Sequence, residues 1–194
     1  MGVERLTAFT DGVIAIIITI MVLELKVPQD TSWDALRPLA QTFLAYALSF
    51  TYVAIYWNNH HHLLHAARFV TGAILWANTL LLFWLSIVPF STGWLSATRF
   101  AQVPTAFYGL TLLAPAIAYF ALTRILLLSG ALEPKVAEVI EKDWKGLISL
   151  ALYIVGILTS LVFPYAAIAL YALVALMWFI PDRRIEQELG PGHD

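Results

Sequence analysis

The chain has 194 residues, of which 60% are hydrophobic and only 12% are charged, and its mean hydropathy is +0.78. An ordinary soluble domain has about 25% charged residues, so this composition predicts a polytopic membrane protein in a lipid bilayer. The formal net charge of −2 offers no basic surface to a nucleic acid, and the lack of cysteine excludes disulfides, thiolate catalysis and cysteine-bound metals.

Long runs without Asp, Glu, Lys or Arg mark the expected membrane-spanning helices, because such a residue at a helix centre costs about 2.5–3.5 kcal/mol on insertion scales. The first helix is expected over residues 5–25, and the uncharged runs 38–67, 69–98 and 100–123 predict helices two, three and four. The run 146–181 would make a helix of about 54 Å, against a hydrocarbon core of about 30 Å. Because Pro164 interrupts it, this run is expected to form two short helices joined by a tight turn.

Six spans place both termini on the same side of the membrane. If that side is the cytoplasm, it holds eight of the eleven Lys and Arg residues, and only Lys26, Arg37 and Arg99 lie outside. This asymmetry fits the positive-inside rule, whereas five spans would move Arg183 and Arg184 outside and remove it. The expected protein is therefore all-α, with six helices in the cell membrane and both termini cytoplasmic.

The whole chain, 1–194, is expected to form a single transmembrane domain without an internal repeat. The first helix lacks a basic segment before it and a small-residue cleavage site after it, so it is not expected to be a signal peptide. The mixed-charge segment 129–145 is expected to be a cytoplasmic connection containing a short helix, and the polar tail 182–194 is expected to be frayed.

The first helix contains one acid near each end, Asp11 and Glu24. The twelve residues between them would rise only about 18 Å as a helix, so both acids cannot easily lie outside a hydrocarbon core of about 30 Å. A carboxylate inside the bilayer is costly unless it faces protein, a partner or water. Asp11 is therefore expected to face neighbouring helices.

A stripe of side chains runs along another face of the same helix. Ile16, Ile20 and Leu23 follow the spacing i, i+4, i+7, and Thr19 lies beside them. Asp11 is about 140° away around the helix, so the acid and the stripe have different roles. From the periodicity alone, the favoured interpretation is that the stripe consists of ordinary lipid-facing or core residues.

The second helix ends in a polar stretch, YWNNHHHLLH, that contains Trp57, Asn59 and the histidines 60, 61, 62 and 65. His61 and His65 have the i, i+4 spacing that allows two imidazoles to bind one zinc or iron ion. Neither an HExxH motif nor a thiol supplies a further ligand, and Asn and His also cap helix ends. A structural role is therefore the favoured interpretation.

The third helix adds Trp76 and Asn78, whose donors would need acceptors if buried. Asp11 is the obvious candidate acceptor. The expectation is a buried polar network in which Asp11 is tied to His, Asn or Trp of the neighbouring helices and sets how these helices meet.

These residues carry a specific resemblance. RLTAFTDGVIAIIITIMVLEL resembles the first helix of the transmembrane protein 175 family of potassium-permeable channels, whose hallmark is an Arg followed by Phe-Ser-Asp. Here the Arg is Arg5 and the triplet is Phe9, Thr10 and Asp11, with Thr in place of Ser. The similarity continues through YWNNHH at 56–61, LWAN at 75–78 and VPFST at 88–92, which covers about the first half of the chain.

The resemblance implies a homotetramer of six-helix chains, without a cofactor or bound metal, in which the first helix of each chain lines a central pore for potassium and other monovalent cations. The family's pore-lining isoleucine corresponds to Ile16, its polar ring to Thr19 and its deeper apolar layers to Ile20 and Leu23. The resemblance also implies a structural network of the motif and polar residues Arg5, Phe9, Thr10, Asp11, Asn59, His60, His61, Trp76 and Asn78. A TVGYG-type carbonyl filter is absent from the sequence, so modest selectivity is expected from an apolar constriction that strips part of the ion's hydration shell.

Two other functions stay open. A proton-coupled transporter would use Asp11 and the histidines of the second helix as a relay. A membrane metalloprotein would bind its metal or haem at the histidines 60–65. No feature of the sequence indicates an enzyme.

Overall fold

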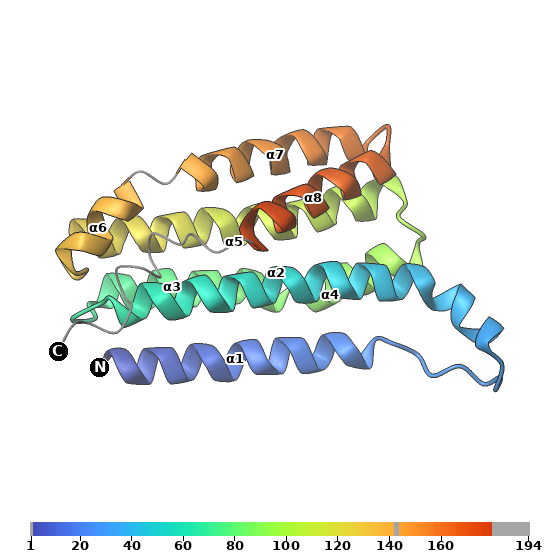
Figure 1. Cartoon of the computed structure of the whole chain (residues 1–194), viewed down its shortest axis with the longest axis horizontal. Coiled ribbons are helices and arrows are strands. Elements are labelled where there is room, and N and C mark those ends of the chain that lie inside the picture. Colours follow the sequence, from blue (N-terminus) through green and yellow to red (C-terminus); the bar gives the residue numbers. More distant parts are fainter. Residues whose placement is uncertain (1, 142–143, 180–194) are drawn as a thin grey trace.

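The computed structural model describes residues 2–141 and 144–179, which are almost entirely helical. The elements in chain order are α1 (Val3–Leu23), the 3₁₀ helix η1 (Trp33–Leu39), α2 (Ala40–His65), α3 (Gly72–Ser86), α4 (Val88–Ala97), α5 (Gln102–Leu128), α6 (Pro134–Glu141), α7 (Trp144–Ser160) and α8 (Pro164–Phe179). The long helices lie side by side along one axis (Figure 1).

Four apolar segments are long enough to cross a membrane: Val3–Leu23, Trp33–His65, Gly72–Ala97 and Gln102–Leu128. The helices α7 and α8 are apolar but shorter, with 17 and 16 residues. The expected break in the last apolar run is confirmed, because α7 ends at Ser160 and α8 begins with Pro164. A proline suits the first helical position, where its missing N–H group has no intrahelical partner to lose. The short helix expected within 129–145 is α6, whereas the tail 182–194 lies outside the described residues.

The expectation of one continuous third helix is wrong in detail, because Ile87 separates α3 from α4. Pro89, the second residue of α4, cannot donate a backbone hydrogen bond, and its ring would clash with the carbonyl of Leu85 in a regular helix. The Ile87 N–H therefore bonds to the Trp84 carbonyl, three residues back, at 3.2 Å. The two helices still form one apolar segment, Gly72–Ala97.

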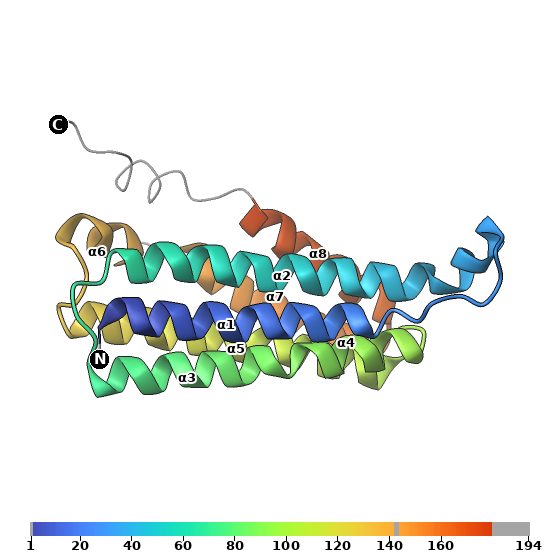
Figure 2. The same ribbon diagram turned by 90° about the horizontal axis from the view of Figure 1, so that it is seen from below.

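The helices pack into two contiguous cores. One core joins α1, the second half of α2, α3 and the second half of α5. The other joins the first half of α2, the end of α4, the first half of α5, and α7 and α8. Figure 2 shows that α1 lies between α2 on one side and α3 and α4 on the other, and Figure 1 shows it at the surface of the bundle opposite α7 and α8. This position leaves one face of α1 without a neighbouring helix among residues 2–141 and 144–179.

The connections gather at the two ends of the bundle. The α2–α3 and α5–α6 connections lie together at the end where α1 begins (Figure 1). There the Arg68 N–H donates to the Ala131 carbonyl at 2.8 Å, and the Arg68 guanidinium donates to the Gly130 carbonyl, also at 2.8 Å. The loop before η1 lies at the opposite end.

Candidate functional site

The two faces of α1 have opposite environments. One face is packed against the bundle, with relative exposures of 0–3%, and consists of Leu6, Thr10, Ile14, Ile17 and Met21. The other face is open: Ile16 is 60% exposed, Ile20 46% and Leu23 75%. The predicted stripe therefore coincides with the face of α1 that the described part of the chain leaves largely uncovered.

Thr19 lies on the same open face and is exposed. Its hydroxyl donates to the carbonyl of Ala15, one turn earlier, at 2.8 Å. Because this bond uses the only hydroxyl proton, the lone pairs of the Thr19 oxygen remain available on the open side. Thr19 therefore presents a neutral oxygen acceptor within an otherwise apolar stripe.

Asp11 faces α2. Its Oδ1 accepts a hydrogen bond from Trp57 Nε1 at 2.9 Å, and the side chain is half-buried. The position follows from helix geometry, because Asp11 is about 140° away from Ile16 around α1. An indole N–H donating to a carboxylate is a charge-assisted bond, which is stronger than a bond between neutral groups.

A second set of bonds joins three helices behind α1. Asn78 of α3 donates its amide to Thr10 Oγ1 at 2.9 Å and accepts at Oδ1 from His60 Nε2 of α2 at 2.6 Å. Since the Asn78 oxygen is the acceptor, His60 carries a proton on Nε2. All three side chains are buried, with exposures of 0–1%. These hydrogen bonds fix the rotation of α1 relative to α2 and α3.

Trp76 does not have the buried donor expected of it. Its side chain is 76% exposed, and the tryptophan that donates to Asp11 is Trp57. Trp76 is two residues before Asn78 and points about 160° away from it around α3, so both cannot face α1. Helix spacing alone shows that the two side chains point in different directions, and the structure places Asn78 on the buried face of α3 with Ile74 and Leu81.

Asn59 and His61 also lie outside these hydrogen bonds. The Asn59 amide donates to the Ile55 carbonyl of its own helix at 2.9 Å, and its backbone oxygen accepts from the Tyr119 hydroxyl at 3.1 Å. His61 is exposed, and its ring stacks on that of His65 at 5.7 Å between centroids. No group of three or more His, Asp or Glu side chains within residues 2–141 and 144–179 is arranged to hold a metal ion.

The remaining motif residues lie on or beside the open face. Arg5 and Phe9 are exposed, Phe9 by 56%, in line with Ile16 along α1. At the other end of α1, the Glu24 carboxylate lies over Gly93 of α4, where an added Cβ would come within 3.3 Å of Glu24 Oε2. The two acids of this region thus contact different helices, Asp11 α2 and Glu24 α4.

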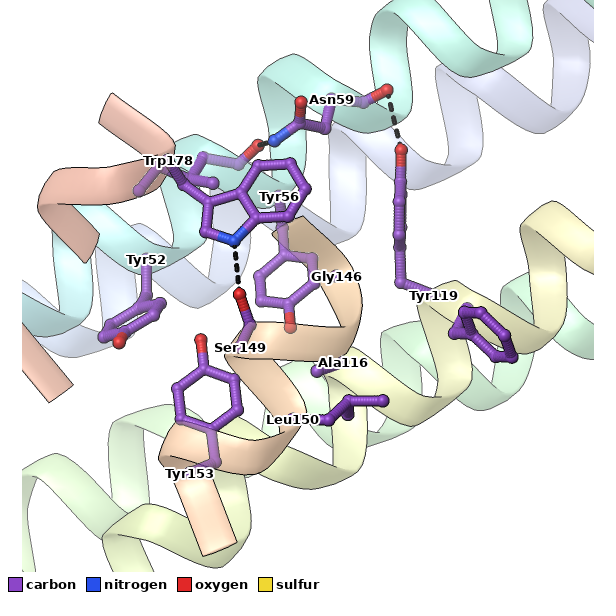
Figure 3. A pocket seen from close by; sticks show the side chains of 12 residues that line it. Tyr52, Tyr56, Asn59, Ala116, Tyr119, Gly146, Ser149, Leu150, Tyr153 and Trp178 are labelled. Atoms are coloured by element: carbon purple, nitrogen blue, oxygen red, sulfur yellow. Dashed lines mark hydrogen bonds between the residues drawn. The ribbon is translucent and has the colours of Figure 1, made fainter. Parts of the chain in front are cut away.

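A cavity of about 50 Å³ lies elsewhere, between α2, α5, α7 and α8 (Figure 3). Trp178 Nε1 donates to Ser149 Oγ at 2.7 Å at its edge, and Tyr52, Tyr56 and Tyr153 contribute rings and hydroxyls to the wall. None of the residues that line it belongs to α1. It has room for a few water molecules and is separate from the open stripe.

These features define a polytopic α-helical membrane protein whose first helix leaves one apolar face open. Comparison with known proteins narrows the class. A model of the family described as "Endosomal/lysosomal potassium channel TMEM175" matches residues 5–89. A potassium channel of Chryseobacterium sp. (strain P1-3) is 54% identical over 185 residues, which cover 95% of this chain and 96% of that protein. The chain belongs to the TMEM175 potassium channel family.

Two further relatives support this membership. A potassium channel of Streptomyces collinus is 36% identical over 141 residues, which cover 68% of each chain. The crystal structure of a lysosomal potassium-selective channel TMEM175 homolog from Chamaesiphon minutus superposes with a TM-score of 0.81 at 27% identity and covers 94% of this chain and 97% of that one. The similarity therefore extends over the second half of the chain, beyond the residues that the family model matches.

Proposed function

We propose that the chain is a potassium-permeable cation channel that works as a homotetramer, with α1 of each copy lining a central pore. The observation that carries the proposal is the open face of α1: Ile16, Ile20 and Leu23 are 46–75% exposed, while the opposite face is buried at 0–3%. A single helix cannot enclose a pore, so a closed ring of copies around this face is required.

In the proposed pore the four copies of Ile16 form an apolar constriction. An ion can pass such a layer only after losing part of its hydration shell, and potassium loses water at a lower cost than sodium. The Thr19 oxygens, whose protons are held by the Ala15 carbonyls, offer neutral ligands directly beyond it. Ile20 and Leu23 add further apolar layers. This arrangement supports modest selectivity for potassium over sodium and other monovalent cations.

The hydrogen bonds behind α1 have a supporting role in this proposal. Trp57–Asp11 and His60–Asn78–Thr10 join α1 to α2 and α3, and they hold the helix in the rotation that directs Ile16 outward. Arg5 and Phe9, on the open face, would complete this motif network between copies. Neither a cofactor nor a resident metal enters the proposed mechanism.

The proposed topology has six spans in the cell membrane: α1, η1 with α2, α3 with α4, α5, α7 and α8. The connections containing Arg68 and Gly130 lie together at the end where α1 begins, as an even number of crossings between them requires. Assigning this end to the cytoplasm follows from the positive-inside rule. The chain 1–194 then acts as one channel domain.

The decisive experiment compares two adjacent positions of α1 in planar bilayers. Ile16→Asn places four amides at the constriction and should lower the free-energy cost of passing a hydrated ion through it. The reversal potential under bi-ionic potassium and sodium should therefore move toward zero. Ile17, which is 3% exposed, faces the core about 100° away. Ile17→Asn should instead lower the thermal stability of the protein.

The opposite pattern would contradict the proposal: unchanged permeation in Ile16→Asn, together with altered selectivity in a folded Ile17→Asn. Flux measurements on the purified protein in liposomes separate a channel from a proton-coupled transporter that uses Asp11 and the histidines. Passive potassium flux at equal pH on both sides supports the channel, and a strict requirement for a pH gradient would support the transporter.

A further inference from the structure

Two rows of exposed aromatic side chains flank α1. The α2 row consists of Phe43, Phe50 and Trp57, and the α3–α4 row consists of Trp76, Phe83 and Phe90. Within each row the residues are seven apart, so the α2 row follows one face of α2, and Trp76 and Phe83 share one face of α3. Phe90 continues this row in α4, beyond Ile87. The side chains are 40–44% exposed in the α2 row and 55–76% exposed in the α3–α4 row.

The rows lie on opposite sides of α1. Figure 2 shows α1 between α2 and the α3–α4 segment, and α2 runs antiparallel to that segment. In a ring that directs the open face of α1 toward the axis, the α2 side of each copy must face the α3–α4 side of the next. The inference thus rests on the proposed homotetramer.

Two hydrogen bonds show which residues of the rows are level along the bundle. Ser49 Oγ lies 2.7 Å from Thr92 Oγ1, which brings these turns of α2 and α4 to the same depth. Phe50 is one residue from Ser49, and Phe90 is two residues from Thr92 in the same direction along the bundle. At 1.5 Å per residue, Phe50 and Phe90 are level to within about 2 Å.

A second hydrogen bond, between α2 and α3, gives the same alignment of the two rows for the next pair of aromatic residues. His60 Nε2 lies 2.6 Å from Asn78 Oδ1. Trp57 is three residues from His60, and Phe83 is five residues from Asn78, again in the same direction. Trp57 and Phe83 are therefore level to within about 3 Å. Rotation about an axis parallel to the helices preserves depth, so side chains of neighbouring copies can meet only where they are level.

We propose that the two rows form the interface between adjacent copies, with Phe50 against Phe90 and Trp57 against Phe83 of the neighbouring subunit. The contact is heterologous, since each copy offers a different row on each side, and such contacts close into rings. Aromatic residues are enriched at interfaces between proteins, and their rings pack favourably edge to face.

The exposed area favours a ring over an isolated pair of copies. At about 200 Å² per aromatic ring, the two rows together expose about 650 Å², roughly half of the 1,200 Å² of the smaller stable interfaces. One such contact would hold a dimer poorly. In a ring every copy makes the contact twice, and the α1 helices add further contacts at the axis.

The lack of native cysteine allows a direct test in membranes. Chains carrying only Phe50→Cys and chains carrying only Phe90→Cys, with tags of different size, are co-expressed and treated with a short bis-maleimide. A cross-linked product containing both tags is expected. The matched control mixes Phe43→Cys with Phe90→Cys, which belong to the same rows but are about 10 Å out of level, and should cross-link at least several-fold less.

A third sample, Ile16→Cys alone, reports on the proposed pore separately, because it should cross-link copies across the axis. Cross-linking of Ile16→Cys without cross-linking of the Phe50 and Phe90 chains would overturn the proposed interface and leave the α1-lined pore standing, with the rows facing lipid. Equal cross-linking of the level and out-of-level mixtures would also overturn it. If the Ile16→Cys chains also fail to cross-link, the result contradicts the proposed central pore together with the interface.

Discussion

The buried Thr10 hydroxyl is the point where α1 meets the hydrogen bonds of the neighbouring helices. It accepts from Asn78 Nδ2 at 2.9 Å, and Asn78 in turn accepts from His60. A family pattern with Ser at this position needs only the hydroxyl, and Thr retains it. The arrangement implies that the hydroxyl oxygen of residue 10 matters more than its methyl group.

We therefore predict that Thr10→Val and Thr10→Ser differ sharply. Valine has nearly the shape of threonine but leaves the Asn78 amide without its acceptor, which should cost about 1–3 kcal/mol of stability. Serine keeps the acceptor and should stay close to the native protein. The measurement is the melting temperature of each purified variant in detergent. Equal melting temperatures for the two variants would show that this bond does not stabilise the packing of α1.

At the scale of elements, one large side chain of the α7–α8 hairpin packs closely against its neighbours. Tyr171 of α8 is fully buried and lies against two glycines, Gly109 of α5 and Gly156 of α7. A Cβ at position 109 would collide with the Tyr171 hydroxyl, and a Cβ at position 156 would collide with the edge of its ring. The glycines allow three helices to approach around this ring.

Gly109→Ala and Gly156→Ala are each expected to destabilise the hairpin by about 1–3 kcal/mol, the usual cost of overpacking a core. Gly72→Ala is the control, because no atom lies within 4 Å of a Cβ at that position. Adding Tyr171→Phe should restore part of the stability of Gly109→Ala, whose Cβ meets the hydroxyl, but not that of Gly156→Ala. Thermal unfolding measures all five proteins, and equal rescue in both backgrounds would contradict this packing.

At the scale of the whole molecule, the open face of α1 has a consequence for assembly. Ile16, Ile20 and Leu23 line a stripe that one chain leaves uncovered, and the proposed pore needs copies of the chain to cover it. Lipid could cover the same stripe in a monomer. The number of chains in the particle therefore distinguishes the two arrangements.

We predict that the purified protein contains four chains. Native mass measurement in detergent should report about four times the 21.6 kDa of one chain. Ile16→Asn should keep this mass, because the substitution lies at the proposed pore axis and leaves the buried face of α1 intact. A particle that contains only one or two chains under all mild detergent conditions would exclude the central pore as proposed.

Local features of the sequence were enough to predict several parts of this protein. Charge is so costly in lipid that the uncharged runs reveal the apolar helices, and the length of the run 146–181 together with Pro164 predicts the turn between α7 and α8. The position of Asp11 inside the first apolar run predicts a polar partner on another helix. The motif around Arg5, Phe9 and Asp11 predicts the family.

Other features were decided only by the tertiary structure. A helix that is apolar on every side carries little periodic signal, so its rotation depends on what packs against it. Helix spacing shows only that Trp76 and Asn78 point in different directions, and the packed bundle is needed to show that Trp57 donates to Asp11 and that Asn78 bonds to Thr10 and His60. The exposure of Ile16 follows from the same packing, because α2, α3 and α4 cover the opposite face of α1 and leave this one open.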